Sequence, residues 1–233
     1  MIIPAYNESE NIEKTVKSII DYRAECDFQL DYIVINDGST DDTLAVCDKN
    51  NIKYINLIQN LGIGGAVQTG YIYANIKGYD IAVQFDGDGQ HDINSLHNIV
   101  NPIIEGKSEF VVGSRFIEGT SGFKSTFMRR MGIKWLSSAI RICTGTKILD
   151  VTSGFRAANK KTIELLATDY PVDYPEPESI VYLLKNGVKV SETQVNMLER
   201  DGGNSSISSW KTLYYMLKVT IAIFCASLQR KVN

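Results

Sequence analysis

The sequence predicts an α/β protein with a mostly parallel central sheet and helices on both of its faces. Short apolar segments alternate with stretches whose apolar residues recur at helical spacing, which is typical of β-α-β connections. Turn-forming, acidic stretches follow several of the apolar segments directly. The chain has 233 residues, of which 44% are hydrophobic and 22% are charged, so it can bury a sizeable core.

The first half of the chain is regular. Strands are expected where short apolar runs end at turn residues, and helices where apolar residues recur at every third or fourth position. In order these are a strand at 1–3, a helix at 10–22, a strand at 31–35, a helix at 40–50, a strand at 53–57, a helix at 64–77 and a strand at 81–85. We expect Pro4 to end the first strand, and Ser39 or Thr40 to cap the second helix.

The second half is less regular. It is expected to contain a strand at 109–112, helices at 131–144 and 160–167, and a strand at 188–196. The segment 210–228 is apolar at helical spacing, and its other face is also fairly apolar, although Lys211 and Lys218 interrupt it. The prediction is one domain over residues 1–205, followed by an apolar C-terminal helix within 206–233.

Composition disfavours several functional classes. The formal net charge of −3 and the sequence pI of about 5.5 argue against a nucleic-acid-binding protein, which usually carries a basic excess. Four scattered cysteines without a CxxC pair indicate a reducing compartment rather than a disulfide framework or a zinc site. The first residues lack a signal-peptide pattern, and no stretch has the roughly 18 uninterrupted apolar residues of a spanning helix.

The stretch QFDGDGQHD places Asp86 and Asp88 two positions apart, in a glycine-rich turn after an expected strand. Loops at 4–8, 37–39 and 86–90 all lie at the carboxyl ends of expected parallel strands, so they should meet at one edge of the sheet. Paired carboxylates there suit Mg²⁺ or Mn²⁺, which take hard oxygen ligands and phosphate partners.

Two other metal sites fit this stretch poorly. Counted from Asp86, an EF-hand would need glycine and glutamate at the positions that His91 and His97 occupy. A zinc site at these two histidines lacks the usual spacing and has no nearby thiolate. The alternative without a metal is a solvated turn rich in aspartate and glycine.

Residues 60–70, NLGIGGAVQTG, open a helix with glycines. The dinucleotide fingerprint GxGxxG would need glycine in place of Val67 and would follow the first strand, so a dinucleotide oxidoreductase is disfavoured. Gly64 would let the backbone approach a nucleotide, whose phosphates a helix N-terminus favours. A close-packed helix start is the alternative.

Several motifs taken together resemble a known family. IPAYNESENI, INDGSTDDT, NLGIGGA, FDGDGQHD, GSRF and DVTSGFR occur in the family's order over residues 2–156. They are similar to the motifs of the inverting family 2 glycosyltransferases of GT-A fold, and within that family to the polyprenyl-phosphate glycosyltransferases such as dolichyl-phosphate mannose synthase. The resemblance implies a Rossmann-like GT-A fold and transfer of a sugar from a UDP- or GDP-linked nucleotide-diphosphate sugar to polyprenyl phosphate.

The resemblance also implies roles for single residues. The nucleotide sugar would be bound by Pro4, Tyr6, Glu8, Asp37, Gly64, Asp86 and Arg130, with Asp37 bonded to the base. The metal ligands would be Asp86, Asp88 and Gln90. Phosphate groups of donor and acceptor would be held by Arg115, one of the pair Arg129 and Arg130, and Arg200. A cation and guanidinium groups can stabilise a leaving diphosphate, and the arginine fork matches phosphate.

Each of these roles has a structural alternative. Glu8 could stabilise a helix N-terminus, and Asp37 could be a plain turn residue. Arg129 and Arg130 could form a solvated patch. Asp150 and Arg156 in DVTSGFR could pair to hold a turn. Arg200 precedes the polar stretch DGGNSS, which lacks the lysine that the family usually has beside the serines.

The acceptor decides whether a catalytic base is needed. A hydroxyl acceptor requires one, normally Asp or Glu. A phosphate monoester does not, because its second pKa is about 6 and it is largely dianionic at neutral pH. DYPEPES at 173–179 offers Glu176 and Glu178, together with Asp173, between prolines that stiffen the expected loop. A carboxylate there would act as a base or would position acceptor or sugar, unless the loop is merely exposed.

The apolar C-terminal helix bears on the partners. It could lie in a membrane interface with its lysines near anionic lipid, contact a membrane partner protein, or pack in a homo-oligomer. The expected place of action is the cytoplasmic face of the cell membrane. Transfer to a hydroxyl of a surface glycan is one rival function, and non-catalytic binding of a nucleotide sugar is another. The sequence leaves the sugar, the base and the oligomeric state open.

Overall fold

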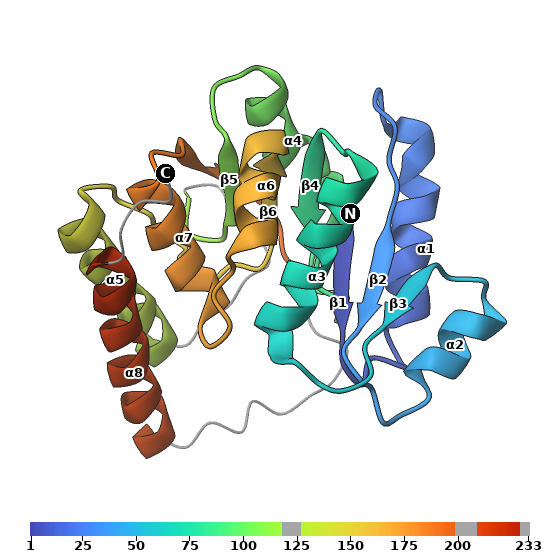
Figure 1. Ribbon diagram of the computed structural model, residues 1–233, viewed down its shortest axis with the longest axis horizontal. Coiled ribbons are helices and arrows are strands. Elements are labelled where there is room, and N and C mark those ends of the chain that lie inside the picture. The colour runs from blue at the N-terminus through green and yellow to red at the C-terminus, as the bar shows by residue number, and fades with distance from the viewer. Residues whose placement is uncertain (118–126, 199–208, 229–233) are drawn as a thin grey trace.

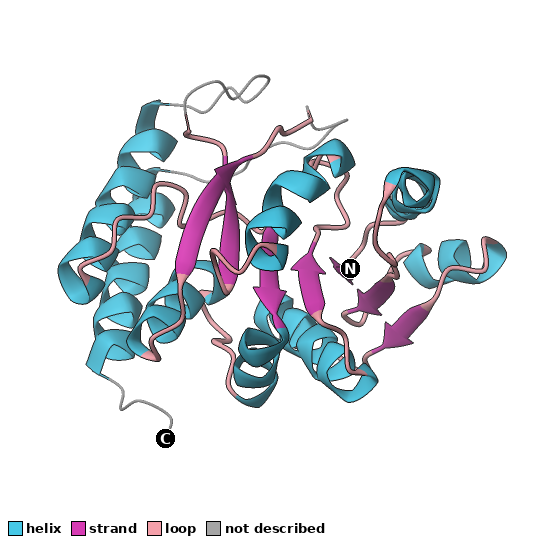
Figure 2. Cartoon of the chain, turned by 90° about the horizontal axis from the view of Figure 1, so that it is seen from above, coloured by secondary structure: helices cyan, strands magenta, loops and turns pink. Residues whose placement is uncertain are grey.

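The protein folds around one seven-stranded sheet with helices on both faces (Figures 1 and 2). A computed structural model describes residues 1–117, 127–198 and 209–228. The strands are β1 (Ile2–Ala5), β2 (Ile33–Asn36), β3 (Tyr54–Asn56), β4 (Ile81–Gln84), β5 (Phe110–Ser114), β6 (Arg156–Asn159) and β7 (Val190–Gln194). The helices are α1 (Ile12–Tyr22), α2 (Thr43–Lys49), α3 (Gly62–Lys77), α4 (Leu96–Ile104), α5 (Phe127–Thr144), α6 (Lys160–Thr168), α7 (Pro175–Lys185) and α8 (Ser209–Leu228).

The strand order is β3-β2-β1-β4-β6-β5-β7. Strands β3, β2, β1 and β4 run parallel, β6 runs antiparallel between β4 and β5, and β5 and β7 run parallel to each other. This confirms the predicted α/β class with a mostly parallel sheet. Because β1, β2 and β4 share one direction, their carboxyl ends lie at one edge of the sheet.

Side-chain alternation along the strands divides the core in two. On β2, Ile33 and Ile35 point into one apolar cluster and Val34 into the other. The first cluster is closed by α3, α5, α6, α7 and α8, and the second by α1, α2 and α4. Burial on both faces explains why the central strands read as continuous apolar runs.

The prediction that Pro4 ends the first strand was wrong, because β1 runs on to Ala5. The Ile2 carbonyl accepts a hydrogen bond from the amide of Phe85, which follows β4. Because backbone groups alternate in direction along a strand, the nitrogen of Pro4 also faces the side of β4. In this sheet β1 and β4 pair only at Ile2 and Gln84. Proline therefore stands where its missing N–H removes no bond of the ladder.

The start of the second helix also differs from the prediction. Helix α2 begins at Thr43 rather than at residue 40, and neither Ser39 nor Thr40 caps it. The Asp41 carboxylate accepts from the Thr43 amide at 3.0 Å instead. Ser39 and Thr40 bond to Asn7 of the neighbouring loop, which takes them away from the helix.

Among the described strands and α-helices, three were not predicted from the sequence: α4, β6 and α7. Residues 173–179, expected as a stiff acidic loop, belong largely to α7, which begins at Pro175. Prolines are tolerated in a first helical turn because the amide groups there have no helical partner. In α4 the inner Pro102 obscured the helical pattern. The sequence RAAN of β6 has little strand propensity, and pairing with both β4 and β5 overrides it.

Helix α8 confirms the expected apolar helix and packs against α5 and α7 (Figure 1). Its buried residues Val219, Ile223 and Ala226 belong to the first core cluster. Within the described part of the chain, no helix has the length and hydropathy needed to cross a membrane. The predicted division between 1–205 and 206–233 falls at residues outside the described ranges, so it stays a prediction.

Candidate active site

The loops after β1, β2 and β4 meet at a cavity of about 470 Å³ at the carboxyl edge of the sheet. The sequence predicted that these loops would converge, and the geometry brings together most of the residues proposed for the nucleotide sugar. The cavity is lined by Pro4, Tyr6, Glu8, Asp37, Asp86 and Asp88, with Gly62 and Ile63 from the start of α3.

The loop after β1 is fastened to the loop after β2. Asn7 adopts a left-handed backbone with φ of 56°, which asparagine tolerates better than most residues. Its side-chain oxygen accepts from the Thr40 amide at 2.8 Å, and its own amide donates to the Ser39 hydroxyl at 3.0 Å. The Glu8 amide donates to the Thr43 hydroxyl at 2.9 Å. These bonds hold Tyr6 and Glu8 at the rim of the cavity.

Asp37 is buried and has a structural partner. Its Oδ1 accepts from the Leu61 amide at 2.7 Å, which fixes the residue that precedes α3. Gly38 beside it has φ of +67°, and a Cβ there would lie 2.8 Å from the backbone of Asn60. The carboxylate thus shapes the entrance to α3 and also lines the cavity.

His91 orients the first carboxylate of the DGD turn. The Asp86 amide donates to Nδ1 of His91 at 3.1 Å, so the ring proton lies on Nε2, which is 3.4 Å from Oδ2 of Asp86. The ring stacks on Phe155 with centroids 4.9 Å apart. Burial lowers the pKa of His91 to about 4, so the imidazole is neutral.

The two carboxylates have the chemistry that a divalent cation needs. Burial raises the pKa of Asp86, against the opposing effects of the Gln84 amide and of the Arg156 and Arg115 charges. Asp88 accepts from the Gln90 amide through Oδ1 at 3.1 Å. The described residues hold no cluster of three or more His, Cys, Asp or Glu placed for a metal. Two carboxylates fit Mg²⁺ or Mn²⁺ if phosphate oxygens and water complete the shell.

Gly154 makes room for the Asp86 carboxylate. A Cβ at this glycine would lie 2.4 Å from Oδ2 of Asp86 and 2.8 Å from Oδ1. This glycine stands in the DVTSGFR motif, and its role could not be predicted, because nothing in the sequence shows that residues 86 and 154 meet.

Arg115 is buried in an ion pair with Asp150. Its Nε and Nη2 donate to the two carboxylate oxygens at 2.6 and 2.7 Å, and Nη2 also donates to the Thr152 hydroxyl at 2.9 Å. The Glu192 carboxylate in turn accepts a hydrogen bond from the Asp150 amide, with 2.7 Å between nitrogen and oxygen. The suggested pairing of Asp150 with Arg156 is therefore wrong. The expected phosphate role of Arg115 competes with a bidentate carboxylate that already occupies the guanidinium.

Glu176 and Glu178 differ in their surroundings. Glu178 accepts from the Tyr174 amide at 3.1 Å, which caps the start of α7. Burial raises the pKa of Glu176, the charge of Arg156 opposes the rise, and the charge of Asp86 adds to it. Neither Glu176 nor Glu178 lines the cavity, and of the two only Glu176 has a pKa that the charge of Asp86 affects.

The remaining predicted residues lie apart from the cavity or outside the described ranges. Gly64 is packed against the segment after α6, where a Cβ would lie 2.6 Å from the Pro171 carbonyl oxygen, which favours the close-packed alternative. Arg130 is exposed on α5. Arg200 lies outside the described residues.

A profile of known proteins decides the family. The model of glycosyl transferase family 2 matches residues 1–166, a region that contains all three cavity loops and the DVTSGFR segment. The chain belongs to glycosyl transferase family 2. The family resemblance seen in the motifs is thus confirmed, and the protein is a glycosyltransferase.

Relatives of this glycosyltransferase are similar over nearly their full length. It is 30% identical to UDP-N-acetylglucosamine–dolichyl-phosphate N-acetylglucosaminyltransferase of Methanococcus voltae, over 93% of this chain and 94% of that one. It is 28% identical to polyprenol monophosphomannose synthase of Mycolicibacterium smegmatis, over 94% and 84% of the two chains.

A solved relative shares the expected GT-A fold. Glucosyl-3-phosphoglycerate synthase from Mycobacterium tuberculosis, in complex with Mn²⁺ and UDP-glucose, superimposes with a TM-score of 0.68. The two proteins are 19% identical, and the match covers 99% of this chain and 79% of that one. At this identity the likeness concerns the fold.

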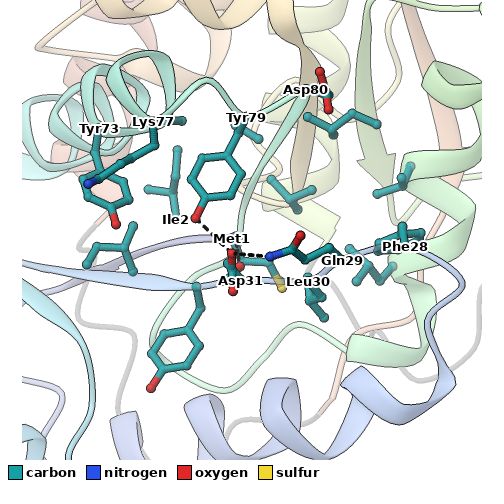
Figure 3. Close-up of a pocket in the computed structure, with 18 of the residues that line it drawn as sticks. Met1, Ile2, Phe28, Gln29, Leu30, Asp31, Tyr73, Lys77, Tyr79 and Asp80 are labelled. Atoms are coloured by element: carbon teal, nitrogen blue, oxygen red, sulfur yellow. Dashed lines mark hydrogen bonds between the residues drawn. The ribbon is translucent and has the colours of Figure 1, made fainter.

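The glycosyltransferase has a larger cavity, of about 630 Å³, at the opposite edge of the sheet (Figure 3). It opens between the beginnings of β2 and β4, beside Met1 at the start of β1. Its carboxylate Asp31 already accepts from the Tyr79 hydroxyl at 3.1 Å and the Gln29 amide at 3.4 Å. This cavity lies at the amino ends of the strands, away from the edge where ligands of such sheets bind.

Proposed function

We propose that this glycosyltransferase moves a sugar from a nucleotide-diphosphate sugar to a polyprenyl phosphate, with inversion at the anomeric carbon and with Mg²⁺ or Mn²⁺ as cofactor. The observation that carries the proposal is the pair Asp86 and Asp88 at the cavity on the carboxyl edge of the sheet. The names of the two relatives above, which act on dolichyl phosphate and make a polyprenol monophosphate sugar, support the acceptor.

The residues of the site suit a single displacement. An oxygen of the acceptor phosphate bonds to the anomeric carbon while the bond from that carbon to the diphosphate breaks, and the nucleoside diphosphate leaves with the bonding electrons. When bound, the cation neutralises charge on that leaving group. Asp86 and Asp88 would hold it, with Gln90 as a further ligand, while Tyr6, Glu8 and Asp37 would line the pocket of the nucleotide.

The described residues leave few cations to meet phosphate directly. Arg115 is occupied by Asp150. The family resemblance gives phosphate contacts to Arg130, which is exposed on α5 apart from the cavity, and to Arg200, which lies outside the described residues; we propose that the two meet the phosphate of the acceptor. Arg115 would then act from a distance, because its buried charge is among those that lower the pKa of Asp86.

A second candidate function is transfer to a hydroxyl group of a glycan. Glu176 favours it, since burial raises its pKa and the charge of Asp86 raises it further. A carboxylate of raised pKa can accept the proton of a hydroxyl. With a phosphate acceptor no base is required, and Glu176 would position the acceptor or the sugar instead.

The function is tested by nucleotide release from UDP-glucose, UDP-N-acetylglucosamine, UDP-galactose and GDP-mannose. Each donor is mixed with Mg²⁺ or Mn²⁺, with and without a short polyprenyl phosphate. We expect release from one donor that requires both the lipid phosphate and the metal, stops with EDTA and returns with excess Mn²⁺. The rate should rise with pH through about 6, as the acceptor becomes a dianion.

Two results would contradict the proposal. Release that ignores the lipid phosphate but requires a glycan hydroxyl would establish the second candidate, and a Glu176→Gln variant should then lose roughly 10²- to 10⁴-fold in rate. Nucleotide binding without any turnover would sink both functions.

We also propose that the enzyme works at a membrane surface, through exposed apolar side chains of α5 and α8. These helices lie together at one end of the molecule (Figure 1). The Trp135 indole N–H donates to the Thr220 hydroxyl at 3.1 Å and joins the two exposed stripes. The apolar α5–α8 face consists of Met128, Met131, Trp135, Ile142, Tyr214, Leu217, Ile221, Phe224 and Leu228.

Charge supports a lipid surface as the partner of this face. Neither 127–149 nor 209–228 contains an acidic residue. Four exposed basic side chains accompany the apolar stripes: Arg130, Lys134, Arg141 and Lys218. Such a combination suits an interfacial position on anionic lipid. The four unpaired cysteines fit the reducing, cytoplasmic side of that membrane.

Vesicle flotation tests the membrane proposal. Wild-type protein is expected to float with vesicles of phosphatidylcholine and phosphatidylglycerol, and less with phosphatidylcholine alone. The double change Leu217→Glu and Ile221→Glu should weaken binding at least tenfold, because burying each of these side chains contributes about 1.5–3 kcal/mol.

The control is Ile76→Glu, the same kind of change at an apolar side chain that is 76% exposed. Ile76 lies on α3 and is not part of the α5–α8 face. Flotation that is equal for both variants would rule the face out. A wild-type dimer in solution that the double change dissociates would instead assign the face to a second copy of the chain.

A further inference from the structure

Arg156 is the largest side chain among those that are fully buried, and the mechanism above gives it no role. It stands at the start of β6, opposite Gln84 at the end of β4. Among the described residues it forms no ion pair. Its guanidinium instead donates to neutral oxygens, at 2.6 Å to the Ser153 carbonyl and at 2.8 Å to the Ser179 hydroxyl.

The bond to Ser153 fixes the turn that confines Asp86. Gly154 follows Ser153, and its backbone leaves no room for a Cβ beside the Asp86 carboxylate. A third bond, from Nη2 of Arg156 to the Val151 carbonyl at 3.4 Å, fastens the other end of the same turn. Movement of this turn would therefore move the wall against which the metal-binding carboxylate rests.

The bond to Ser179 reaches helix α7, which carries Glu176. Ser179 is fully buried in the first turns of α7. Its hydroxyl accepts from Arg156 and donates to the Glu176 carbonyl at 3.2 Å. One buried side chain thus connects the wall beside Asp86 to the backbone of Glu176.

We propose that Arg156 and Ser179 are positioning residues that set the separation between Asp86, on the donor side, and Glu176, on the acceptor side. The inference rests on the proposed function, because it takes Asp86 as a ligand of the donor's metal and Glu176 as a neighbour of the acceptor. Neither Arg156 nor Ser179 lines the donor cavity. Their loss should disturb alignment of the reacting groups more than binding of the donor.

The test is Ser179→Ala, which removes one hydroxyl and leaves the 151–156 turn and α7 otherwise intact. We expect kcat to fall roughly 10- to 100-fold, since a misplacement of about 1 Å can have that effect. The KM of the donor, and its affinity measured by calorimetry in the presence of Mn²⁺, should stay within about twofold of wild type. Arg156→Lys, which keeps the charge but loses the fork, should show the same split between kcat and KM.

Ser137→Ala is the matched control. Ser137 is also a buried serine on a helix, and its hydroxyl donates to the Ile148 carbonyl, which belongs neither to the 151–156 turn nor to α7. The thermal midpoint of each variant is measured, and kinetics are taken below the lowest midpoint. An equal effect of Ser137→Ala and Ser179→Ala on kcat would overturn the inference, as would a fall in donor affinity that accounts for the whole loss.

The outcome separates this inference from the function on which it rests. A wild-type enzyme that turns over no donor with lipid phosphate defeats the proposed function. A wild-type enzyme that turns over, beside a folded Ser179→Ala variant of equal kcat, defeats only the positioning role.

Discussion

An Asp88→Asn variant is expected to lose on the order of 10³-fold in kcat, through loss of one of the two charges that hold the cation. Stabilisation of a leaving diphosphate by a metal is worth several kcal/mol, and a neutral amide binds Mg²⁺ or Mn²⁺ far less well than a carboxylate. The loop itself should survive. The asparagine side-chain oxygen can still accept the Gln90 amide, which lies 3.1 Å from Oδ1 of Asp88. Steady-state nucleotide release measures the effect, and raising Mn²⁺ should restore part of the rate.

Asp92→Asn is the control for that variant, because it makes the same chemical change four residues further along the same loop. Asp92 caps a short 3-10 helix through the Asn94 amide at 3.0 Å, a role that asparagine also fills well. Its activity should stay close to wild type. A folded Asp88→Asn variant with wild-type turnover would mean that the pair does not hold the catalytic metal.

A Gly154→Ala variant is expected to lose roughly 10²-fold in kcat or more while it stays folded. The added methyl group would stand 2.4 Å from Oδ2 of Asp86, so either the carboxylate or the 153–156 turn must move. A displacement of about 1 Å at a reacting centre is enough for such a loss. Affinity for Mn²⁺, measured by electron paramagnetic resonance in the presence of nucleotide, should fall with the rate.

Gly132→Ala on α5 provides the comparison. There the new methyl group would meet only the flexible side chain of Met216, with its sulfur at 3.2 Å. Alanine is also the better helix former, so this variant should keep wild-type activity. If Gly154→Ala binds Mn²⁺ and turns over like wild type, the contact with Asp86 has no functional weight.

The sequence was sufficient where function follows from topology. Asp86, Asp37 and Glu8 are far apart in the chain, yet each follows a parallel strand, and the rule that such loops meet at one edge was enough to group them. The motif order then indicated the family. The first inference uses the backbone path and the second the residue motifs, and neither requires knowledge of which side chains bond to each other.

Partner choice is where prediction from the sequence failed. Asp150 and Arg156 share one motif, yet Asp150 pairs with Arg115, 35 residues away, and Arg156 bonds to Ser179 on α7. Nothing in the neighbouring sequence favours those partners, because only the fold brings β5, β6 and α7 close to one another. For the same reason Glu176 and Glu178 looked equivalent in the sequence. In the structure Glu178 accepts a capping bond at the start of α7, whereas the pKa of Glu176 is raised in part by the charge of Asp86.

The cavity in Figure 3 marks a place where the sheet has few backbone bonds. Strands β1 and β4 lie side by side near the middle of the sheet, yet they share the single residue pair Ile2 and Gln84. The two halves of the sheet are therefore held together mainly by the apolar side chains of the two core clusters, and much less by the ladder between these strands.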